Sequence, residues 1–171
     1  SFLENRAYED TALPIEAGQT ISQPYTVAVQ TELLKVQPGD KILEVGTGSG
    51  YQVAILLEMG AKVFSIERHR KLYVRTGKTL NALGYYPKLF YGDGYKGLPT
   101  YGPFDKIVIT AGAPEIPEAL RKQLNPGGIL VAPVGNTQHQ EMIRLIKKAE
   151  TDFIREVHGG FVFVPLRPGT G

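Results

Sequence analysis

Short apolar segments alternate with longer helical ones from residue 41 onward. Five segments are short, apolar and rich in β-branched residues, and we expect them to be strands: residues 41–45, 62–67, 88–92, 106–111 and 128–134. Most of them carry apolar side chains on both faces, which is typical of strands that helices cover on each side. The alternation predicts an α/β domain with a largely parallel sheet.

The segments between these strands have the boundaries of helices. Residues 51–59 end at Gly60 and residues 69–83 end at Gly84, and glycine is the residue that most often follows a helix C-terminus. An earlier helix is expected to begin at Pro24, because proline suits the first helical position. The C-terminal part of the chain differs. Residues 141–150 and 159–166 are strand-like, and we expect them to form an antiparallel pair at the sheet edge.

Length and composition favour one domain. The chain has 171 residues, of which 42% are apolar, enough for one packed core and too few for two ordinary domains. We therefore expect residues 1–171 to form a single domain. The chain starts at Ser1 in a turn-rich segment, so we expect that the native N-terminus is missing.

Charge and residue usage argue against several functions. The 19 basic and 17 acidic residues are mixed along the chain, and only residues 68–71 form a basic cluster, which is weak support for nucleic-acid binding. There is no cysteine, and the three histidines are scattered, so no metal site is predicted. No apolar run approaches the roughly 20 residues that span a bilayer, and no signal-peptide pattern opens the chain. We expect a cytoplasmic protein that does not bind membranes.

A glycine-rich loop follows the first predicted strand. The segment "LEVGTGSGY" places Glu44, Gly46, Gly48 and Gly50 in the pattern E-x-G-x-G-x-G, and glycine lets the backbone turn sharply and approach a ligand. A dinucleotide loop needs a small residue at position 51, and a P-loop needs Lys-Ser or Lys-Thr there, but this chain has Tyr-Gln. The loop therefore favours neither NAD nor a nucleoside triphosphate. A strand-to-helix turn without function stays the alternative.

Two acidic residues end the next two strands. Glu67 follows Gly48 by about 20 residues, a position from which a carboxylate accepts hydrogen bonds from ribose hydroxyls. Asp93 lies in "GDG", where it is placed to accept a hydrogen bond from an adenine amino group. The alternatives are that Glu67 is a surface residue paired with Arg68 or Arg70, and that Asp93 belongs to a plain Asp-Gly turn. Both acids are expected at the carboxyl edge of the sheet, where ligands bind in open α/β folds.

The segment "GQTISQP", residues 18–24, gathers hydroxyl and amide groups directly before a helix. Free N–H groups at a helix N-terminus favour an anion, so Thr20, Ile21 and Ser22 are candidates for an anion-binding loop. The alternative is that Thr20, Ser22 and Gln23 only cap the helix.

The E-x-G-x-G-x-G loop resembles the first motif of S-adenosylmethionine-dependent methyltransferases with a Rossmann-like fold. The chain as a whole resembles the protein-L-isoaspartate O-methyltransferase family over about residues 13–166, and "GQTISQP" is the distinctive part. The other matching segments, in the same order, are "ILEVGTGSGYQVAIL", "SIER", "GDGYKGLP", "PFDKIVITAGAPEIPEAL", "QLNPGGILVAPVG" and "FVFVPL". The resemblance implies a mostly parallel sheet of about seven strands with helices on both faces. Members of the family ordinarily carry a helical N-terminal segment, which we expect to be missing here.

This resemblance implies a reaction and its partners. The activity is methyl transfer from S-adenosylmethionine to the free carboxylate of isoaspartyl residues in damaged proteins and peptides, the start of their repair, and we expect a monomer. A carboxylate with a pKa near 4 is already ionised, so no strong general base is needed. The protein must hold the anion in line with the methyl group and exclude water. By resemblance Ser22 is the active-site serine, and we interpret it as an orienting donor and not as a nucleophile.

The resemblance and the loop positions together give the expected cofactor contacts. These are Thr20, Ile21, Glu44, Gly46, Thr47, Gly48, Gly50, Glu67, Arg68, Asp93, Gly94, Thr110, Thr137 and Gln140. Residues 110–117 are either a substrate loop or an ordinary proline-framed turn.

Two other functions stay open. One is a methyltransferase that acts on another nucleophile, such as RNA or a small molecule. An RNA-acting enzyme is expected to show a stronger basic face, and amine methylation commonly uses N-P-P-Y or D-P-P-Y where this chain has "TAGAP". A non-catalytic module that binds the cofactor or modified peptides is the third reading. The intact glycines and Ser22 favour an enzyme.

Overall fold

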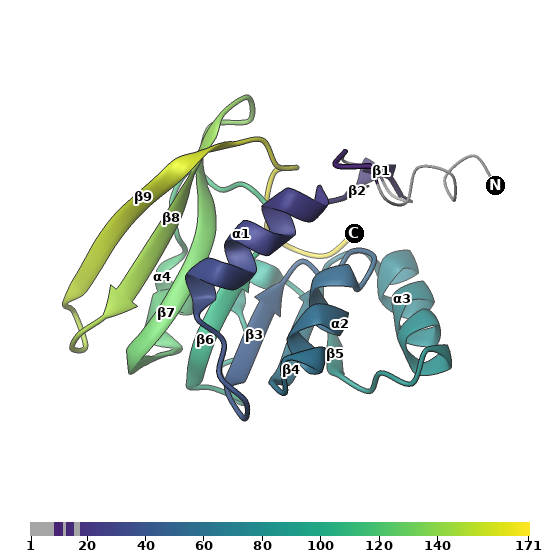
Figure 1. The fold of residues 1–171 in the computed structure, drawn as a ribbon, viewed down its shortest axis with the longest axis horizontal. Helices are drawn as coiled ribbons and strands as arrows, with labels where there is room; N and C mark the ends of the chain where they lie inside the picture. Colours follow the sequence, from purple (N-terminus) through teal and green to yellow (C-terminus); the bar gives the residue numbers. More distant parts are fainter. Residues whose placement is uncertain (1–8, 12, 16–17) are drawn as a thin grey trace.

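The computed structural model of the chain describes residues 9–11, 13–15 and 18–171 (Figure 1). The first eight residues of the predicted domain, and residues 12, 16 and 17, lie outside the described residues. Within the described part, no helix is long and apolar enough to cross a membrane.

A seven-stranded sheet forms the centre of the molecule, in the order β5-β4-β3-β6-β7-β8-β9. The first five strands in this order are parallel, and β8 is antiparallel to both of its neighbours. The predicted parallel sheet and its antiparallel edge are therefore confirmed. The strands are β3 Lys41–Val45, β4 Lys62–Glu67, β5 Lys88–Tyr91, β6 Phe104–Ile109, β7 Leu124–Gly135, β8 Gln140–Lys147 and β9 Phe153–Phe161.

Helices cover the two faces of the sheet unequally. Ile42 of β3 packs in one apolar cluster with Leu34 and Leu56, whereas its neighbour Leu43 packs in another with Leu120. The first cluster belongs to the face that carries three longer helices, and the second to the face that carries α4 and a single 3-10 turn (Figure 1). The helical elements are α1 Pro24–Leu34, α2 Tyr51–Glu58, α3 Arg70–Ala82, η3 Gly94–Lys96 and α4 Glu118–Lys122.

The thinly covered face is filled partly by aromatic rings. Phe64 of β4 lies 5.6 Å from Phe104 and 5.6 Å from Tyr101, measured between ring centroids, and Phe90 lies 4.7 Å from Tyr101. Large rings bury much apolar area per residue. These rings and the aliphatic residues of the same cluster fill the face that carries the five-residue helix Glu118–Lys122.

The last strand differs from its prediction. The strand expected at residues 159–166 is wrong in its bounds, because β9 spans Phe153–Phe161. Residues 164–166 instead run beside Gly112, whose N–H donates to the carbonyl of Val164 at 2.8 Å and whose carbonyl accepts from Leu166 at 2.7 Å. An extended segment has the same alternating pattern whether it pairs in the sheet or crosses its end. This segment crosses the carboxyl edge.

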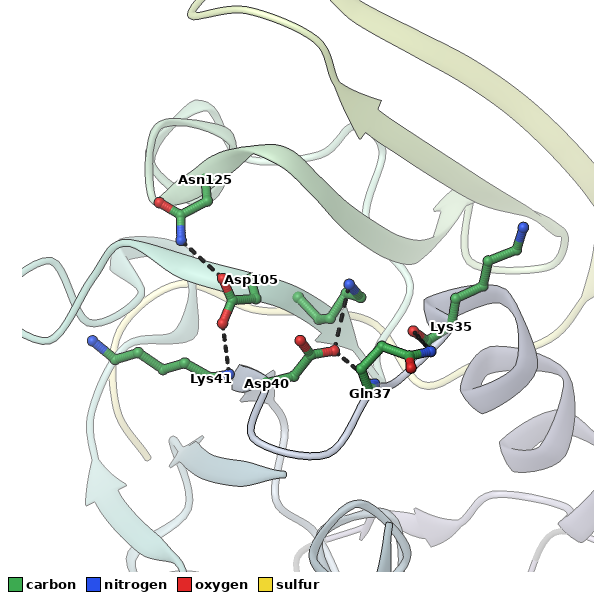
Figure 2. A network of polar contacts seen from close by, with 7 residues as sticks. Lys35, Gln37, Asp40, Lys41, Asp105 and Asn125 are labelled. Atoms are coloured by element: carbon green, nitrogen blue, oxygen red, sulfur yellow. Dashed lines mark hydrogen bonds and ion pairs between the residues drawn. The ribbon is translucent and has the colours of Figure 1, made fainter. Parts of the chain in front are cut away.

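Carboxylates tie the strands together at the opposite, amino-terminal edge (Figure 2). Asp105 at the start of β6 accepts hydrogen bonds from the backbone N–H of Lys41 at 2.8 Å and from Asn125 Nδ2 at 3.0 Å. Asp40 lies 3.4 Å from the Nζ of Lys106. These contacts join the starts of β3, β6 and β7, so the carboxyl edge is left for a binding site.

Candidate functional site

A cavity of about 310 Å³ lies at the carboxyl ends of β3, β4 and β6. Three regions that are distant in sequence line it: the hydroxyl-rich loop before α1, the glycine loop after β3, and the tail at residues 164–167. The structure brings ten of the predicted residues together on its wall: Thr20, Ile21, Ser22, Gly46, Thr47, Gly48, Glu67, Arg68, Gly94 and Thr110.

The glycine loop needs glycine for steric reasons. Gly46 has a φ of 100°, and a Cβ at this position would lie 2.6 Å from Thr110 Oγ1. The same hydroxyl donates to the Gly46 carbonyl at 2.7 Å, so Thr110 fixes the first turn of the loop. Gly50 forms the N-cap of α2 and is buried, and it is not among the residues that line the cavity. Its role in the structure is to turn the chain into the helix.

Glu67 faces the cavity with both carboxylate oxygens held in place. Oε2 accepts from the backbone N–H of Gly48 at 2.9 Å, and Oε1 accepts from that of His69 at 2.8 Å. The residue is 4% exposed, so a surface role is contradicted, and Arg68 donates instead to the carbonyls of Pro168 and Gly169. Each carboxylate oxygen has a further lone pair. Glu67 is thus oriented to accept hydrogen bonds from a diol.

Glu44 lies beneath the loop and does not line the cavity. It is fully buried, and Ser65 Oγ donates to its Oε1 at 2.6 Å. Burial raises the pKa of Glu44 to about 8, against the opposing effect of the Ser65 hydrogen bond and with a smaller contribution from the charge of Glu67. The Ser65 hydroxyl also lies 2.6 Å from Thr47 Oγ1. Glu44 is therefore mostly neutral at pH 7 and supports the loop from below.

The structure gives the neighbouring residues Asp93 and Gly94 different environments. Gly94 lines the cavity, whereas Asp93 does not, and the Oδ1 of Asp93 accepts from the backbone N–H of Tyr95 at 2.9 Å. That bond caps the short 3-10 turn, as in an Asx turn. The adenine contact of Asp93 stays a prediction.

Thr137 and Gln140 also lie outside the lining residues. Thr137 is exposed in the turn between β7 and β8. Gln140 is buried, and its Oε1 accepts from the backbone N–H of Phe163 at 2.7 Å while its Nε2 donates to the Asn136 carbonyl. Gln140 therefore holds the chain at Phe163 in place. Because it does not line the cavity, its contact with the cofactor stays a prediction.

Of the candidate substrate loop at residues 110–117, Thr110 and Ala111 reach the cavity. Gly112 pairs with the tail segment, and Ala113 forms a bridge with Val134 of β7. This loop therefore helps to hold the tail over the carboxyl edge of the sheet.

The hydroxyl-rich loop is held by a two-stranded pair, β1 Leu13–Pro14 and β2 Thr20–Ile21, in which Leu13 faces Ile21. The capping alternative is contradicted within the described residues, because the α1 N-cap is Gln23 and makes no side-chain cap hydrogen bond. Asp10 Oδ1 accepts the backbone N–H of Tyr25 at 2.9 Å instead. Thr20, Ile21 and Ser22 therefore form part of the cavity wall.

The sequence reasoning missed several lining residues. Val27, Gln52 and the tail residues 164–167 border the cavity as well. The pattern of residues 159–166 predicts only a strand, and Gln52 belongs to no motif that indicates a contact with the cavity. Among the residues that the structure describes, no group of three or more histidine or acidic side chains could hold a metal ion.

Comparison with known proteins identifies the family of the chain. The family model described as protein-L-isoaspartate(D-aspartate) O-methyltransferase matches residues 1–170. A protein-L-isoaspartate O-methyltransferase of Christiangramia forsetii is 58% identical over 167 residues, which cover 97% of this chain and 78% of that protein.

Solved structures show the same fold. A protein-L-isoaspartate O-methyltransferase superposes with a TM-score of 0.88 at 28% identity, covering 96% of this chain and 55% of the solved one. A second, from Plasmodium falciparum and in complex with S-adenosyl-L-homocysteine, has a TM-score of 0.79 at 27% identity and covers 94% of this chain and 81% of its own.

Proposed function

The chain belongs to the protein-L-isoaspartate O-methyltransferase family, and on that premise we propose that it methylates the free carboxylate of L-isoaspartyl residues in damaged proteins and peptides. The methyl donor is S-adenosylmethionine. The proposal rests mainly on the shared cavity, which is lined both by the glycine loop with Glu67 and by the loop with Ser22.

The residues present fit this cofactor. Glu67 offers oriented acceptors for ribose hydroxyls, and the turn at Gly46 and Gly48 allows a nucleoside to lie against the backbone. Gly94 and Thr110 border the same space. When bound, S-adenosylmethionine supplies a methyl group on a sulfonium, which carries its own leaving group.

The acceptor requires binding and orientation more than proton transfer. An isoaspartyl carboxylate is ionised at neutral pH, so a general base adds nothing. The hydroxyls of Thr20 and Ser22 and the backbone of their loop can supply hydrogen-bond donors, and residues 164–167 line the same cavity. An isoaspartyl linkage lengthens the main chain by one methylene and presents its carboxylate in a different direction from aspartate. A wall of directional donors discriminates between them by reach.

The competing functions have less support. The net charge of +2 is small for an RNA-modifying enzyme. A non-catalytic binding module does not explain why Ser22 lines the same cavity as the residues expected to bind the cofactor, such as Gly48 and Glu67. The single domain over residues 1–171, the monomeric state and the cytoplasmic location stay predictions.

The test is methyl incorporation into a matched pair of peptides that differ only in one isoaspartyl or aspartyl linkage. We expect methyl ester on the isoaspartyl peptide and little on its partner, with weak dependence on salt. Equal labelling of both peptides contradicts the proposal, as does methylation that requires RNA and disappears after nuclease treatment.

A further inference from the structure

A basic groove runs along α3 beside the cavity. It begins in the basic cluster of residues 68–71, which the proposed function leaves unexplained. No acidic side chain is among the described residues that line it. Its lining includes four basic side chains and two apolar ones that are 45% and 43% exposed: Arg70, Lys71, Arg75, Lys78, Val74 and Tyr91.

The stability of α3 does not explain these charges. Acidic residues in the first turn of a helix, and acid–base pairs four residues apart, stabilise it. The 13 residues of α3 contain no acid, the first turn carries Arg70 and Lys71, and Lys71 lies four residues before Arg75. None of the ion pairs between described residues involves Arg70, Lys71 or Lys78. A local arrangement that opposes the fold indicates a function, and these charges fit an anionic partner.

The basic groove is continuous with the cavity. His69 lines both, and Arg68 and the exposed Arg167 line the cavity as well. Glu67 is the one acidic residue among the described residues of the cavity wall, and it is buried with both oxygens hydrogen-bonded to backbone N–H groups. The exposed charge is therefore positive from the cavity to the far end of the groove.

We propose that the basic groove binds acidic side chains that flank the isoaspartyl residue in a protein substrate. The inference rests on the proposed function, because it assumes that an isoaspartyl peptide enters the adjoining cavity. The rest of that peptide must leave the cavity across its border, and each extended residue spans about 3.3–3.6 Å, so a few residues carry it along the groove. Nucleic-acid phosphates also suit lysine and arginine, but a groove that adjoins a peptide site favours peptide carboxylates.

The experiment is steady-state methylation of isoaspartyl peptides that carry two glutamates about one to five residues away, on either side. Each is compared with the same peptide carrying glutamines. We expect the KM of the best-placed glutamate peptide to be about fivefold lower at low salt, as for two exposed ion pairs. This difference should vanish near about 0.5 M salt, because exposed charges are screened. The kcat values should be equal, since the groove does not touch the reacting atoms.

The combined variant Lys71→Glu and Lys78→Glu reverses charge in the groove and leaves the cavity wall intact. Both side chains are exposed, so folding and the affinity for S-adenosylhomocysteine should be retained. We expect the preference to reverse, with the lower KM now on the glutamine peptide, because like charges repel.

Lys62→Glu with Lys148→Glu is the matched control. Both lysines are exposed, neither lines the cavity or the groove, and the variant has the same net charge as the groove variant. It should keep most of the preference for glutamate. An equal loss in the two variants would assign the effect to the charge of the whole molecule and overturn the inference.

Other results would also overturn the inference. These are equal KM values at every glutamate position, a groove variant that keeps the preference, and a groove variant with weakened S-adenosylhomocysteine binding, which would assign the groove to the cofactor. A single-stranded oligonucleotide that binds through Lys71 and Lys78, without any glutamate preference, would make the groove a nucleic-acid site. If no isoaspartyl peptide were methylated at all, the proposed function itself would fail, so the two failures are distinguishable.

Discussion

Ser22 lies on the cavity wall beside the N-terminus of α1, and its loop is held by β1 and β2. The carboxylate that it is expected to contact loses negative charge as the ester forms. A donor to this group therefore contributes by orienting the carboxylate, since stronger hydrogen bonding to the ionised form would slow the reaction.

Ser22→Ala should lower kcat by about 10- to 100-fold, the range expected for lost alignment of a reacting atom. The affinity for S-adenosylhomocysteine should stay nearly unchanged. Steady-state kinetics and calorimetry on the same preparation separate the two quantities. A collapse of cofactor binding with normal turnover at saturation would assign Ser22 to the cofactor pocket.

Glu67→Ala should weaken S-adenosylhomocysteine binding by about 1 to 3 kcal/mol, because the hydrogen bonds it accepts are charge-assisted. Calorimetry measures the loss directly. Glu58→Ala is a matched control, because Glu58 is exposed on α2, bonds to Tyr85 and lies outside the cavity. An unchanged dissociation constant in folded Glu67→Ala would remove Glu67 from the ribose site.

Glu44 makes stability depend on pH. Its pKa is raised from 4.5 to about 8 on folding, so between these values the folded state binds more protons than the unfolded state. The stability that its neutral form contributes is fully present below pH 4.5 and is lost as the pH rises through about 8. The slope approaches about 1.4 kcal/mol per pH unit for one proton.

Glu44→Gln should remove this dependence, because an amide stays neutral and can still accept from Ser65. We expect the free energy of unfolding of the unmodified protein to fall relative to the variant between about pH 5 and pH 8. Urea unfolding of both proteins across this range measures the difference. Parallel curves would show that Glu44 titrates normally.

At the scale of the elements, the two edges of the sheet have separate roles. The amino-terminal edge holds the Asp105 contacts with Lys41 and Asn125 (Figure 2), and none of these three residues lines the cavity. A substitution at Asp105 therefore tests the stability of the fold separately from the methyl-transfer reaction.

Asp105→Ala should lower the free energy of unfolding by about 1–3 kcal/mol, because it leaves the Lys41 N–H and the Asn125 amide without their acceptor. KM and kcat should stay unchanged at a temperature where the variant is folded. Denaturant unfolding and kinetics measure the two effects. A large loss of activity in the folded variant would show that the two edges are coupled.

The sequence predicted the elements that alternate cleanly. β3, β4 and β6 are short, largely buried and rich in apolar residues, and α2 and α3 are followed by the expected glycines, so burial and backbone freedom determine them locally. The position of β9 was not predictable in this way. Its Gly159 and Gly160 disfavour a strand, and they are tolerated because β9 is an edge strand with one neighbour.

The candidate site was predicted where a motif lies on one loop, and missed where it depends on packing. The glycine loop and Glu67 are local signals at strand ends. The tail residues 164–167 and Gln52 reach the cavity only because Gly112 pairs with the tail and Thr31 orients the amide. Neither contact leaves a pattern in a single sequence.

At the scale of the whole molecule, the fold brings the residues expected to bind the cofactor and those expected to bind the acceptor carboxylate to the carboxyl ends of the parallel strands. The parallel strands β3, β4 and β6 present the glycine loop, Glu67 and Thr110 at one end of the sheet, and Val27 of α1 and residues 164–167 line the same cavity. The ribbon in Figure 1 shows α1 and these strands. We propose that this arrangement selects one kind of carboxylate among many.

The most direct test is an internal competition within one peptide that carries an isoaspartyl residue, ordinary aspartate and glutamate side chains, and a free C-terminus. After incubation with S-adenosylmethionine, fragmentation mass spectrometry locates the methyl ester. We expect a single ester on the isoaspartyl carboxylate, which is base-labile and closes to a succinimide with loss of methanol. Esters spread over the ordinary carboxylates, or an ester only at the C-terminus, would contradict it.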